Sequence, residues 1–173
     1  MSNKKDKISE WYKLHSKSVI SYIFLMTKNY EQAEDLTHET FLKAYMKYDS
    51  FKEQSSEKTW LFSIAHNLTM DFFRKRRPVM LLKGMFVKKD NEKQPVDIIQ
   101  IKEESNELYN ALIKIKDTYR NVLILRKIKG FSIEETAIIL GWSESKVKST
   151  QLRAINALKK TLEKESYFDE KAN

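Results

Sequence analysis

Residues 131–155 read FSIEETAIILGWSESKVKSTQLRAI, which is the pattern of two helices separated by one short turn. Ser132 and Glu135 have the spacing of a capping box, in which each side chain bonds the backbone N–H of the other, so a helix begins there. Gly141 can adopt the positive φ that ends a helix tightly, and Ser143 can cap the next helix. A short helix, a glycine-containing turn and a longer helix together indicate a helix-turn-helix.

Both helices of this pattern have an apolar side. In the first helix we expect the buried residues to be Ile133, Ala137, Ile138 and Leu140. In the second helix we expect the apolar side to contain Val147, Gln151, Ala154, Ile155, Leu158 and Leu162. The opposite side is expected to contain Ser145, Lys146, Ser149, Leu152 and Arg153.

This second face has the residue types that read DNA. In helix-turn-helix proteins the N-terminal part of the second helix enters the major groove. Lysine and arginine can bond guanine there, serine can bond several base edges, and an apolar group can contact a thymine methyl. The pattern therefore favours DNA binding over its alternative, which is the solvated polar face of an ordinary helical hairpin.

The composition of the whole chain agrees with a polyanionic partner. The chain has 173 residues and a formal net charge of +8, which suits nucleic acid or a membrane surface. It contains no cysteine, which excludes disulfides, thiolate metal sites and a thiol nucleophile. The longest apolar stretch, Val19–Met26, is far shorter than the ~20 residues that span a bilayer. The N-terminus lacks the apolar core of a secretory signal, so we expect a cytoplasmic protein without membrane insertion.

Glycine and proline, which interrupt helices, are rare and unevenly placed. Residues 1–77 contain neither, whereas residues 78–104 contain Pro78, Gly84 and Pro95. We predict an all-α fold of two small helical domains, residues 1–77 and 105–165, joined by a flexible linker at 78–104 and followed by a tail at 166–173. The C-terminal domain contains the helix-turn-helix. The expected helices span about 7–28, 30–48, 57–76, 104–116, 118–129, 132–140 and 144–164.

The helix at 30–48 is expected to have a core face and an acidic outer face. Asn29 and Gln32 have the spacing of a capping pair. The core face should contain Ala33, Leu36, Thr37, Thr40, Phe41, Ala44 and Tyr48. The opposite face should contain Asp35, His38, Glu39, Leu42 and Met46. An acidic rim around exposed apolar groups suits a protein partner rather than DNA; the alternative is that Leu42 and Met46 pack on the first helix.

The helix at 57–76 ends in a basic run. Its buried stripe is expected to contain Trp60, Leu61, Ile64, Ala65, Leu68 and Phe72. Arg74 and Arg77 point away from that stripe. Cations at a helix C-terminus offset the helix dipole, which is one account of these charges. The other account is phosphate binding, because aromatic and cationic side chains beside a polar loop suit single-stranded nucleic acid. The residues alone leave both accounts open.

Three segments of the chain, in order, resemble bacterial RNA polymerase sigma factors of the extracytoplasmic-function (ECF) group. AEDLTHETFLKAY is similar to the segment that binds core polymerase, and KTWLFSIAHNLTMDFFRKRR is similar to the promoter-melting segment. The stretch 131–155 is similar to the segment that reads the −35 element. The resemblance covers roughly residues 10–77 and 105–162. It implies a transcription initiation factor that binds core polymerase and directs promoter recognition and melting, without being an enzyme.

Together with the faces described above, the resemblance assigns individual residues. The residues assigned to core-polymerase binding are Asp35, His38, Glu39 and Leu42, although His38 departs from the glutamine common at its position. Those assigned to the −10 element and the melted strand are Ser55, Ser56, Lys58, Trp60, Asn67, Asp71, Arg74 and Arg77. Within this set, Ser55–Thr59 match a loop that holds a flipped base. Those assigned to the −35 element are Ser145, Lys146, Lys148, Ser149 and Arg153, although helical angle alone puts Lys148 at the margin of the apolar side.

The resemblance further implies three partners: core RNA polymerase, promoter DNA in its double-stranded and melted forms, and an anti-sigma factor. We expect no cofactor and no metal. The resemblance also implies that the linker threads through the polymerase toward the RNA exit path, with no added regulatory domain.

Two other classes of function compete with this interpretation. A helix-turn-helix regulator with a sensing or dimerising N-terminal domain should show a cavity-forming apolar pattern at 29–77, and this stretch instead has an acidic face. An enzyme is disfavoured because His15, His38 and His66 are widely separated in the sequence. Asp35 and His38 have the spacing found in di-metal helical bundles, but no second Glu-x-x-His copy exists.

Overall fold

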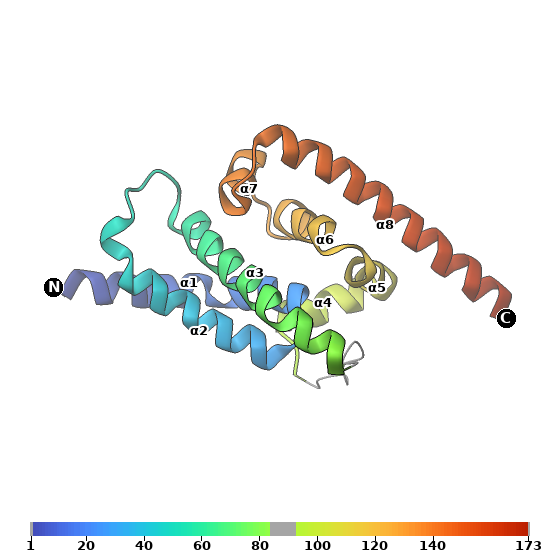
Figure 1. The fold of residues 1–173 in the computed structure, drawn as a ribbon, viewed down its shortest axis with the longest axis horizontal. Helices are drawn as coiled ribbons and strands as arrows, with labels where there is room; N and C mark the ends of the chain where they lie inside the picture. The colour runs from blue at the N-terminus through green and yellow to red at the C-terminus, as the bar shows by residue number, and fades with distance from the viewer. Residues whose placement is uncertain (1, 84–92, 173) are drawn as a thin grey trace. The chain divides into compact units, whose positions relative to one another are not determined.

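The computed structural model describes residues 2–83 and 93–172, and the chain divides into two compact units, residues 1–95 and 96–173. Within the described ranges every regular element is a helix (Figure 1), which confirms the predicted all-α class. None of these described helices is long and apolar enough to cross a bilayer.

The first unit is built from three helices that pack on one another: α1 (Ser2–Thr27), α2 (Tyr30–Met46) and α3 (Glu57–Lys83) (Figure 1). A short 3-10 helix, η1 (Tyr48–Ser50), follows α2. The core is apolar and includes Val19, Tyr22, Ile23, Leu25, Met26, Ala33, Leu36, Phe41, Ala44, Leu61, Phe62, Ala65 and Leu68. The helices therefore stabilise one another mainly by burying these faces.

Local polar contacts set where the helices of the first unit begin. The Asn29 side chain accepts the N–H of Gln32 at 3.3 Å and caps α2, as predicted. Ser56 accepts the N–H of Thr59 at 3.1 Å through its hydroxyl and caps α3. These caps satisfy N–H groups that have no partner inside the helix.

The structure changes the helix boundaries expected around residues 78–104. Helix α3 was expected to end near residue 76 but continues to Lys83, so Pro78 lies inside it. Proline removes its own N–H and strains the preceding turn, yet the good helix formers that follow allow the helix to continue. Helix α4 (Val96–Glu104) was missed; it forms because Ile98 is fully buried and α4 packs on the next helix. Residues 84–92 of the predicted linker lie outside the described residues.

The second unit continues with four α-helices: α5 (Asn106–Lys114), α6 (Asp117–Leu123), α7 (Ile133–Leu140) and α8 (Glu144–Ala172). A π-helical segment, η2 (Ile124–Ile128), extends α6, where one helix at 118–129 was expected. Helix α8 packs against α5, α6 and α7 (Figure 1). The unit's core includes Ile98, Leu112, Val122, Leu123, Ile124, Leu125, Phe131, Ile139, Leu140, Val147 and Ala154.

Two expectations for the second unit were wrong. The buried side of α7 consists of Thr136, Ala137, Ile139 and Leu140, whereas Ile138 is 46% exposed and Ile133 is half-buried. A two-turn helix that packs against both η2 and α8 takes its buried face from those neighbours, which a helical wheel does not include. Helix α8 continues through most of the predicted tail, because no glycine or proline follows Gly141. An ion pair between Glu165 and Lys114 of α5 also ties its distal part to the unit.

Candidate nucleic-acid and protein interfaces

The turn between α7 and α8 forms as its sequence predicts. Ser132 accepts the N–H of Glu135 at 3.0 Å, and the Glu135 carboxylate accepts the N–H of Ser132 at 2.7 Å, which completes the capping box. Gly141 lies in the left-handed region with φ 66° and ends α7. The Ser143 hydroxyl accepts the N–H of Lys146 at 3.2 Å and starts α8. Only Gly141–Ser143 separate the two helices. The glycine turn and the Ser143 cap therefore fix the orientation of α8 relative to α7.

The outward face of α8 has the polar residues that the sequence predicted. Exposed side chains there are Ser145, Lys146, Lys148, Ser149 and Arg153. The side facing the unit's core contains buried Val147, Thr150 and Ala154. Leu152 is 64% exposed among the polar residues. The face therefore offers cations, hydroxyls and an apolar group to a partner, which are the groups that read a major groove.

Arg126 links this helix to the rest of the second unit, and the sequence reasoning missed it. Its Nε donates to the Gln151 side chain of α8 at 2.8 Å, and its guanidinium also bonds the backbone oxygen of Phe131. One side chain thus joins η2, the start of the helix-turn-helix and α8. Gln151 on the expected apolar side was the available signal, because a half-buried amide there needs a polar partner.

The acidic face of α2 is exposed as predicted. Asp35, His38 and Glu39 are all exposed, and Leu42 is 59% exposed. Met46 is also exposed, so the alternative in which Leu42 and Met46 pack on α1 is wrong. The buried side of α2 consists of Ala33, Leu36, Thr37, Thr40, Phe41 and Ala44, all of which were predicted.

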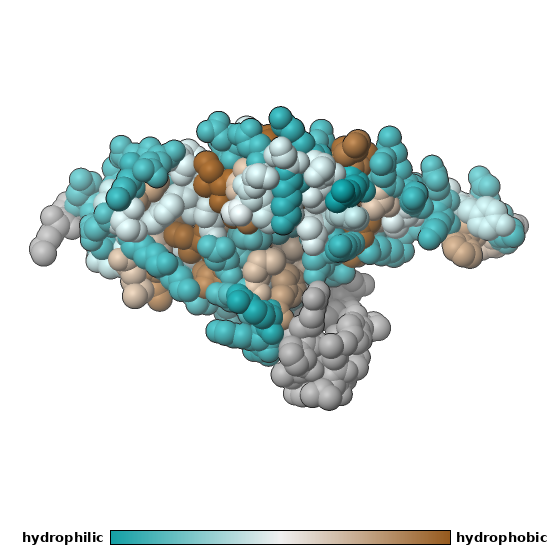
Figure 2. All heavy atoms as spheres, turned by 45° about the horizontal axis from the view of Figure 1, so that its top comes forward, coloured by the Kyte–Doolittle hydropathy of each residue, from teal (hydrophilic) through white to brown (hydrophobic). Residues whose placement is uncertain are grey.

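Exposed apolar side chains do not form one continuous patch on the face shown in Figure 2. That face is mainly hydrophilic, and its hydrophobic groups are separated from one another. Isolated exposed apolar residues are ordinary on a protein surface. The exposed apolar side chains on α2 and α8 therefore indicate an interface only in combination with the charged side chains beside them.

The loop between η1 and α3 is attached to an aromatic cluster that the sequence reasoning did not find. The Trp60 ring lies 4.8 Å from that of Phe51 and 6.1 Å from that of Trp11, measured between centroids. The Trp11 ring also contacts Tyr48 at 5.6 Å. Trp60 was predicted both in the buried stripe and as a DNA contact; it is half-buried, with one side against this cluster.

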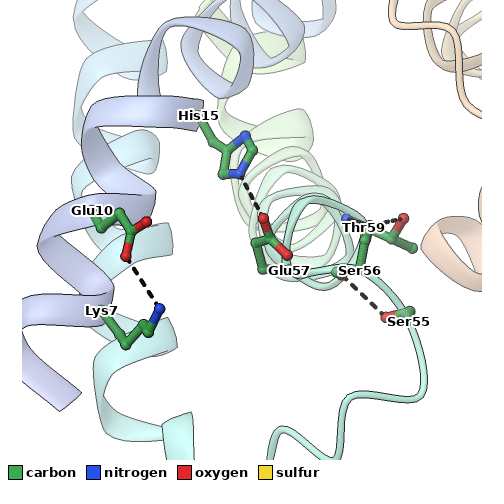
Figure 3. Close-up of polar contacts among 7 residues, drawn as sticks. All are labelled: Lys7, Glu10, His15, Ser55, Ser56, Glu57 and Thr59. Carbon is green, nitrogen blue, oxygen red and sulfur yellow. Dashed lines mark hydrogen bonds and ion pairs between the residues drawn. The ribbon is translucent and has the colours of Figure 1, made fainter. Parts of the chain in front are cut away.

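A cleft of about 300 Å³ lies beside this cluster, between α1 and the loop. Its lining residues are Lys7, Glu10, Trp11, Leu14, Tyr48, Phe51, Glu53, Ser55 and Glu57. Figure 3 shows the polar contacts around it: Lys7 and Glu10 pair at 3.3 Å, and His15 Nε2 lies 3.5 Å from the Glu57 carboxylate. The cleft thus combines aromatic walls with hydrogen-bond acceptors. The predicted loop residue Ser55 lines it, whereas Ser56 is occupied in capping α3.

Along α3, Asn67, Asp71 and Arg74 follow one another at intervals of four and three residues and therefore share a face. Asn67 and Arg74 are exposed, and Asp71 forms an ion pair with Arg74. Lys58, the second residue of α3, is half-buried. The side chain of Arg77 lies outside the described residues.

The histidines of the described residues belong to no group that could hold a metal ion. His66 is buried on α3, where its Nδ1 lies 3.1 Å from the Tyr22 hydroxyl of α1. Burial lowers the pKa of His66 to about 4, so it is neutral at physiological pH. No three His, Asp or Glu side chains of the described residues converge to hold a metal ion.

Comparisons with known proteins match both units. Residues 11–79 match Sigma-70 region 2, and residues 105–158 match Sigma-70, region 4. The chain is 37% identical to the ECF RNA polymerase sigma factor SigX of Bacillus subtilis (strain 168), over 88% of this chain and 81% of the relative. It is 36% identical to the RNA polymerase sigma factor YlaC of the same organism, over 92% of this chain and 94% of the relative.

A solved structure is similar in fold as well as in sequence. The sigma factor RpoE from Bartonella quintana, in complex with the anti-sigma factor NepR, has a TM-score of 0.72 and 28% identity with this chain. The alignment covers 91% of this chain and 97% of RpoE.

Proposed function

This chain belongs to the ECF RNA polymerase sigma factors, and from that membership we propose which of its residues contact the polymerase and the promoter. As a sigma factor, it binds core RNA polymerase and directs promoter recognition and melting at the start of transcription. A helix-turn-helix regulator with a sensing or dimerising N-terminal domain is not favoured, because residues 11–79 match Sigma-70 region 2.

We assign the first unit, residues 1–77 with the continuation of α3 to Lys83, to sigma region 2. Residues 105–165, together with the rest of α8, are assigned to sigma region 4. Helix α4 packs on α5 and belongs with the second unit, so the connection between the two regions is shorter than residues 78–104.

The recognition of the −35 element is assigned to the outward face of α8. The observation that carries this assignment is that Ser145, Lys146, Lys148, Ser149 and Arg153 are all exposed on a helix whose start is fixed by a capped, left-handed glycine turn. Base contacts require side chains that point out from a rigid helix. Arg153 and Ser149, four residues apart, are the proposed base-reading pair.

The binding of core polymerase is assigned to the outer face of α2. Asp35 and Glu39 supply charge for a basic partner surface, and Leu42 supplies an apolar centre that the fold leaves exposed. His38 lies on the same face and is assigned a rim contact, because it is exposed beside the two carboxylates. By resemblance to the family, we propose that Asp35 and Glu39 bind the clamp helices of the largest polymerase subunit.

Promoter melting is assigned to α3 and the loop before it. The aromatic-walled cleft at Ser55 is the proposed pocket for a base flipped from the −10 element. Trp60 supports the loop through its ring contact with Phe51, and Ser56 orients the loop through the cap. Lys58 is assigned to the same DNA contact. Asn67, Asp71 and Arg74 form the proposed contact with the melted strand, and Arg77 is assigned to the same contact.

We infer three further properties of the chain from its relatives. RpoE of Bartonella quintana was solved with an anti-sigma factor, and we infer that a protein of that class also holds this chain inactive. We infer that it acts in the cytoplasm, where RNA polymerase acts. We also infer that it catalyses no reaction of its own and requires no cofactor or metal.

Run-off transcription tests these assignments directly. Core polymerase is supplied with templates that have randomised −35 and −10 elements, with and without this chain, and transcripts are sequenced. We expect transcripts from a defined subset of templates only when the chain is present. Arg153→Ala should relax that selection at one position of the −35 element while still co-purifying with core polymerase. The absence of any chain-dependent transcript would contradict the function, and unchanged selection by Arg153→Ala would contradict the α8 assignment.

A further inference from the structure

Lys146 occupies a position that the stability of α8 does not explain. It lies in the first turn of α8, where unpaired N–H groups leave partial positive charge and favour acidic rather than basic side chains. Glu144 in the same turn follows that preference, and Lys146 does not. Its ammonium group instead lies over the Trp142 ring, with Nζ 4.2 Å from the ring centroid. This is the geometry of a cation–π interaction.

The position of Trp142 is fixed independently of Lys146. Gly141 ends α7 in the left-handed conformation, and two backbone bonds close the turn: Trp142 N–H to the Ala137 oxygen at 3.0 Å, and Gly141 N–H to the Ile138 oxygen at 3.3 Å. These are the two bonds of a Schellman motif, which sets the path of the residue that follows the glycine. The turn therefore fixes the backbone of Trp142, and the half-buried ring lies beneath the Lys146 ammonium group.

The direction of the Lys146 side chain limits what it can contact. Side chains on a helix lean toward its N-terminus, and Lys146 follows this tendency by reaching back to the turn. Its ammonium group is thus held at the N-terminal edge of α8, whereas Ser149 and Arg153 lie one and two turns further along. Lysine side chains and helix N-termini are common donors to phosphates, and such contacts position the protein without reading sequence.

We propose that Trp142 is a positioning residue for promoter binding, which holds Lys146 for a sequence-independent contact with a phosphate beside the −35 element. The proposal rests on the assignment of α8 to that element. Lys146 then contributes affinity that depends on salt, while Ser149 and Arg153 contribute sequence preference. A lysine without the ring beneath it loses more rotamer freedom when it binds, so the ring raises affinity without touching DNA.

A double-mutant cycle in the reconstituted holoenzyme tests the proposal. The DNA is the promoter duplex that the wild-type holoenzyme selects from the randomised library, and affinity is measured at several KCl concentrations. Lys146→Gln should weaken binding three- to ten-fold and reduce the slope of log affinity against log salt by about 0.9, the loss of one phosphate contact. Trp142→Leu should weaken binding roughly two- to five-fold. Trp142→Phe should retain most of the affinity, because phenylalanine still presents a ring.

The double variant decides whether the two residues act together. If Trp142 acts through Lys146, adding Trp142→Leu to Lys146→Gln changes nothing further. Additive losses would overturn the proposal, as would altered preference among −35 sequences in either single variant. The salt slope of Lys146→Gln is independent of any folding defect at Trp142, and an unchanged slope would also overturn it. If the wild-type holoenzyme selects no promoter, the assigned function fails; if it selects one and the cycle is additive, only this inference fails.

Discussion

Replacing Leu42 by alanine separates the contribution of this residue to folding from its contribution to polymerase binding. Leu42 is 59% exposed on the acidic face of α2, so about 41% of its surface is covered in the free chain. Complete burial of a leucine side chain stabilises a fold by about 1.5–3 kcal/mol. The covered fraction therefore accounts for roughly 0.6–1.2 kcal/mol, and the higher helix propensity of alanine offsets a little of that.

A matched variant on the same helix shows how much stability is lost when a buried leucine is truncated. Leu36 is 7% exposed and faces the core, so Leu36→Ala should cost about 2–5 kcal/mol of unfolding free energy. Both variants are compared by thermal melting of the free chain, where 1 kcal/mol corresponds to a shift of about 4–8 °C for a domain of this size. Leu42→Ala should shift the melting temperature by only a few degrees, and Leu36→Ala by far more.

In polymerase binding, in contrast to melting, we expect a large effect of Leu42→Ala. Leu42→Ala should weaken competition for core polymerase by about five-fold or more, because a central apolar contact in an interface is worth over about 1 kcal/mol. Glu39→Lys should weaken it as well, mainly through slower association that depends on salt. A large fall in melting temperature for Leu42→Ala, together with unchanged polymerase affinity, would assign Leu42 to the core and refute the reasoning for this interface.

Three further changes test the other parts of the fold and site. Arg153→Ala should cost about 1–3 kcal/mol of promoter binding and relax selection at one −35 position, measured by run-off transcription from −35 variants, with core binding unchanged. Gly141→Ala should destabilise the second unit by about 1 kcal/mol in urea unfolding, because φ is 66° there although nothing lies within 4 Å of an added Cβ, and Gly141→Asn should cost less. The pKa of His66 is lowered from 6.5 to about 4, so the unfolded chain binds more protons between these values. The contribution of His66 to the free energy of unfolding should therefore be fully present above about pH 6.5 and be lost as the pH drops toward 4. At pH 5 the free energy of unfolding should be lower by roughly 2 kcal/mol. His66→Gln should flatten this dependence.

The features that the sequence determined are those in which a few neighbouring residues contain all the relevant chemistry. The capping box at Ser132 and Glu135, the left-handed Gly141 and the exposed face of α8 depend on spacings of three or four residues along one helix. The acidic face of α2 was predicted for the same reason, because the buried side of a long amphipathic helix follows its period. Three ordered segments were enough to indicate the family.

Tertiary structure decided the features that depend on which elements meet. The aromatic cluster joins Trp11, Phe51 and Trp60 from separate parts of the chain, and the Arg126–Gln151 bond joins residues 25 positions apart. The burial of Ile139 in place of Ile138 depends on the neighbours that cover a short helix. Helix α4 exists because Ile98 finds a core to enter. The free energy of burial depends on the surface that covers a side chain. That surface comes from residues distant in the sequence, so the local sequence does not specify it.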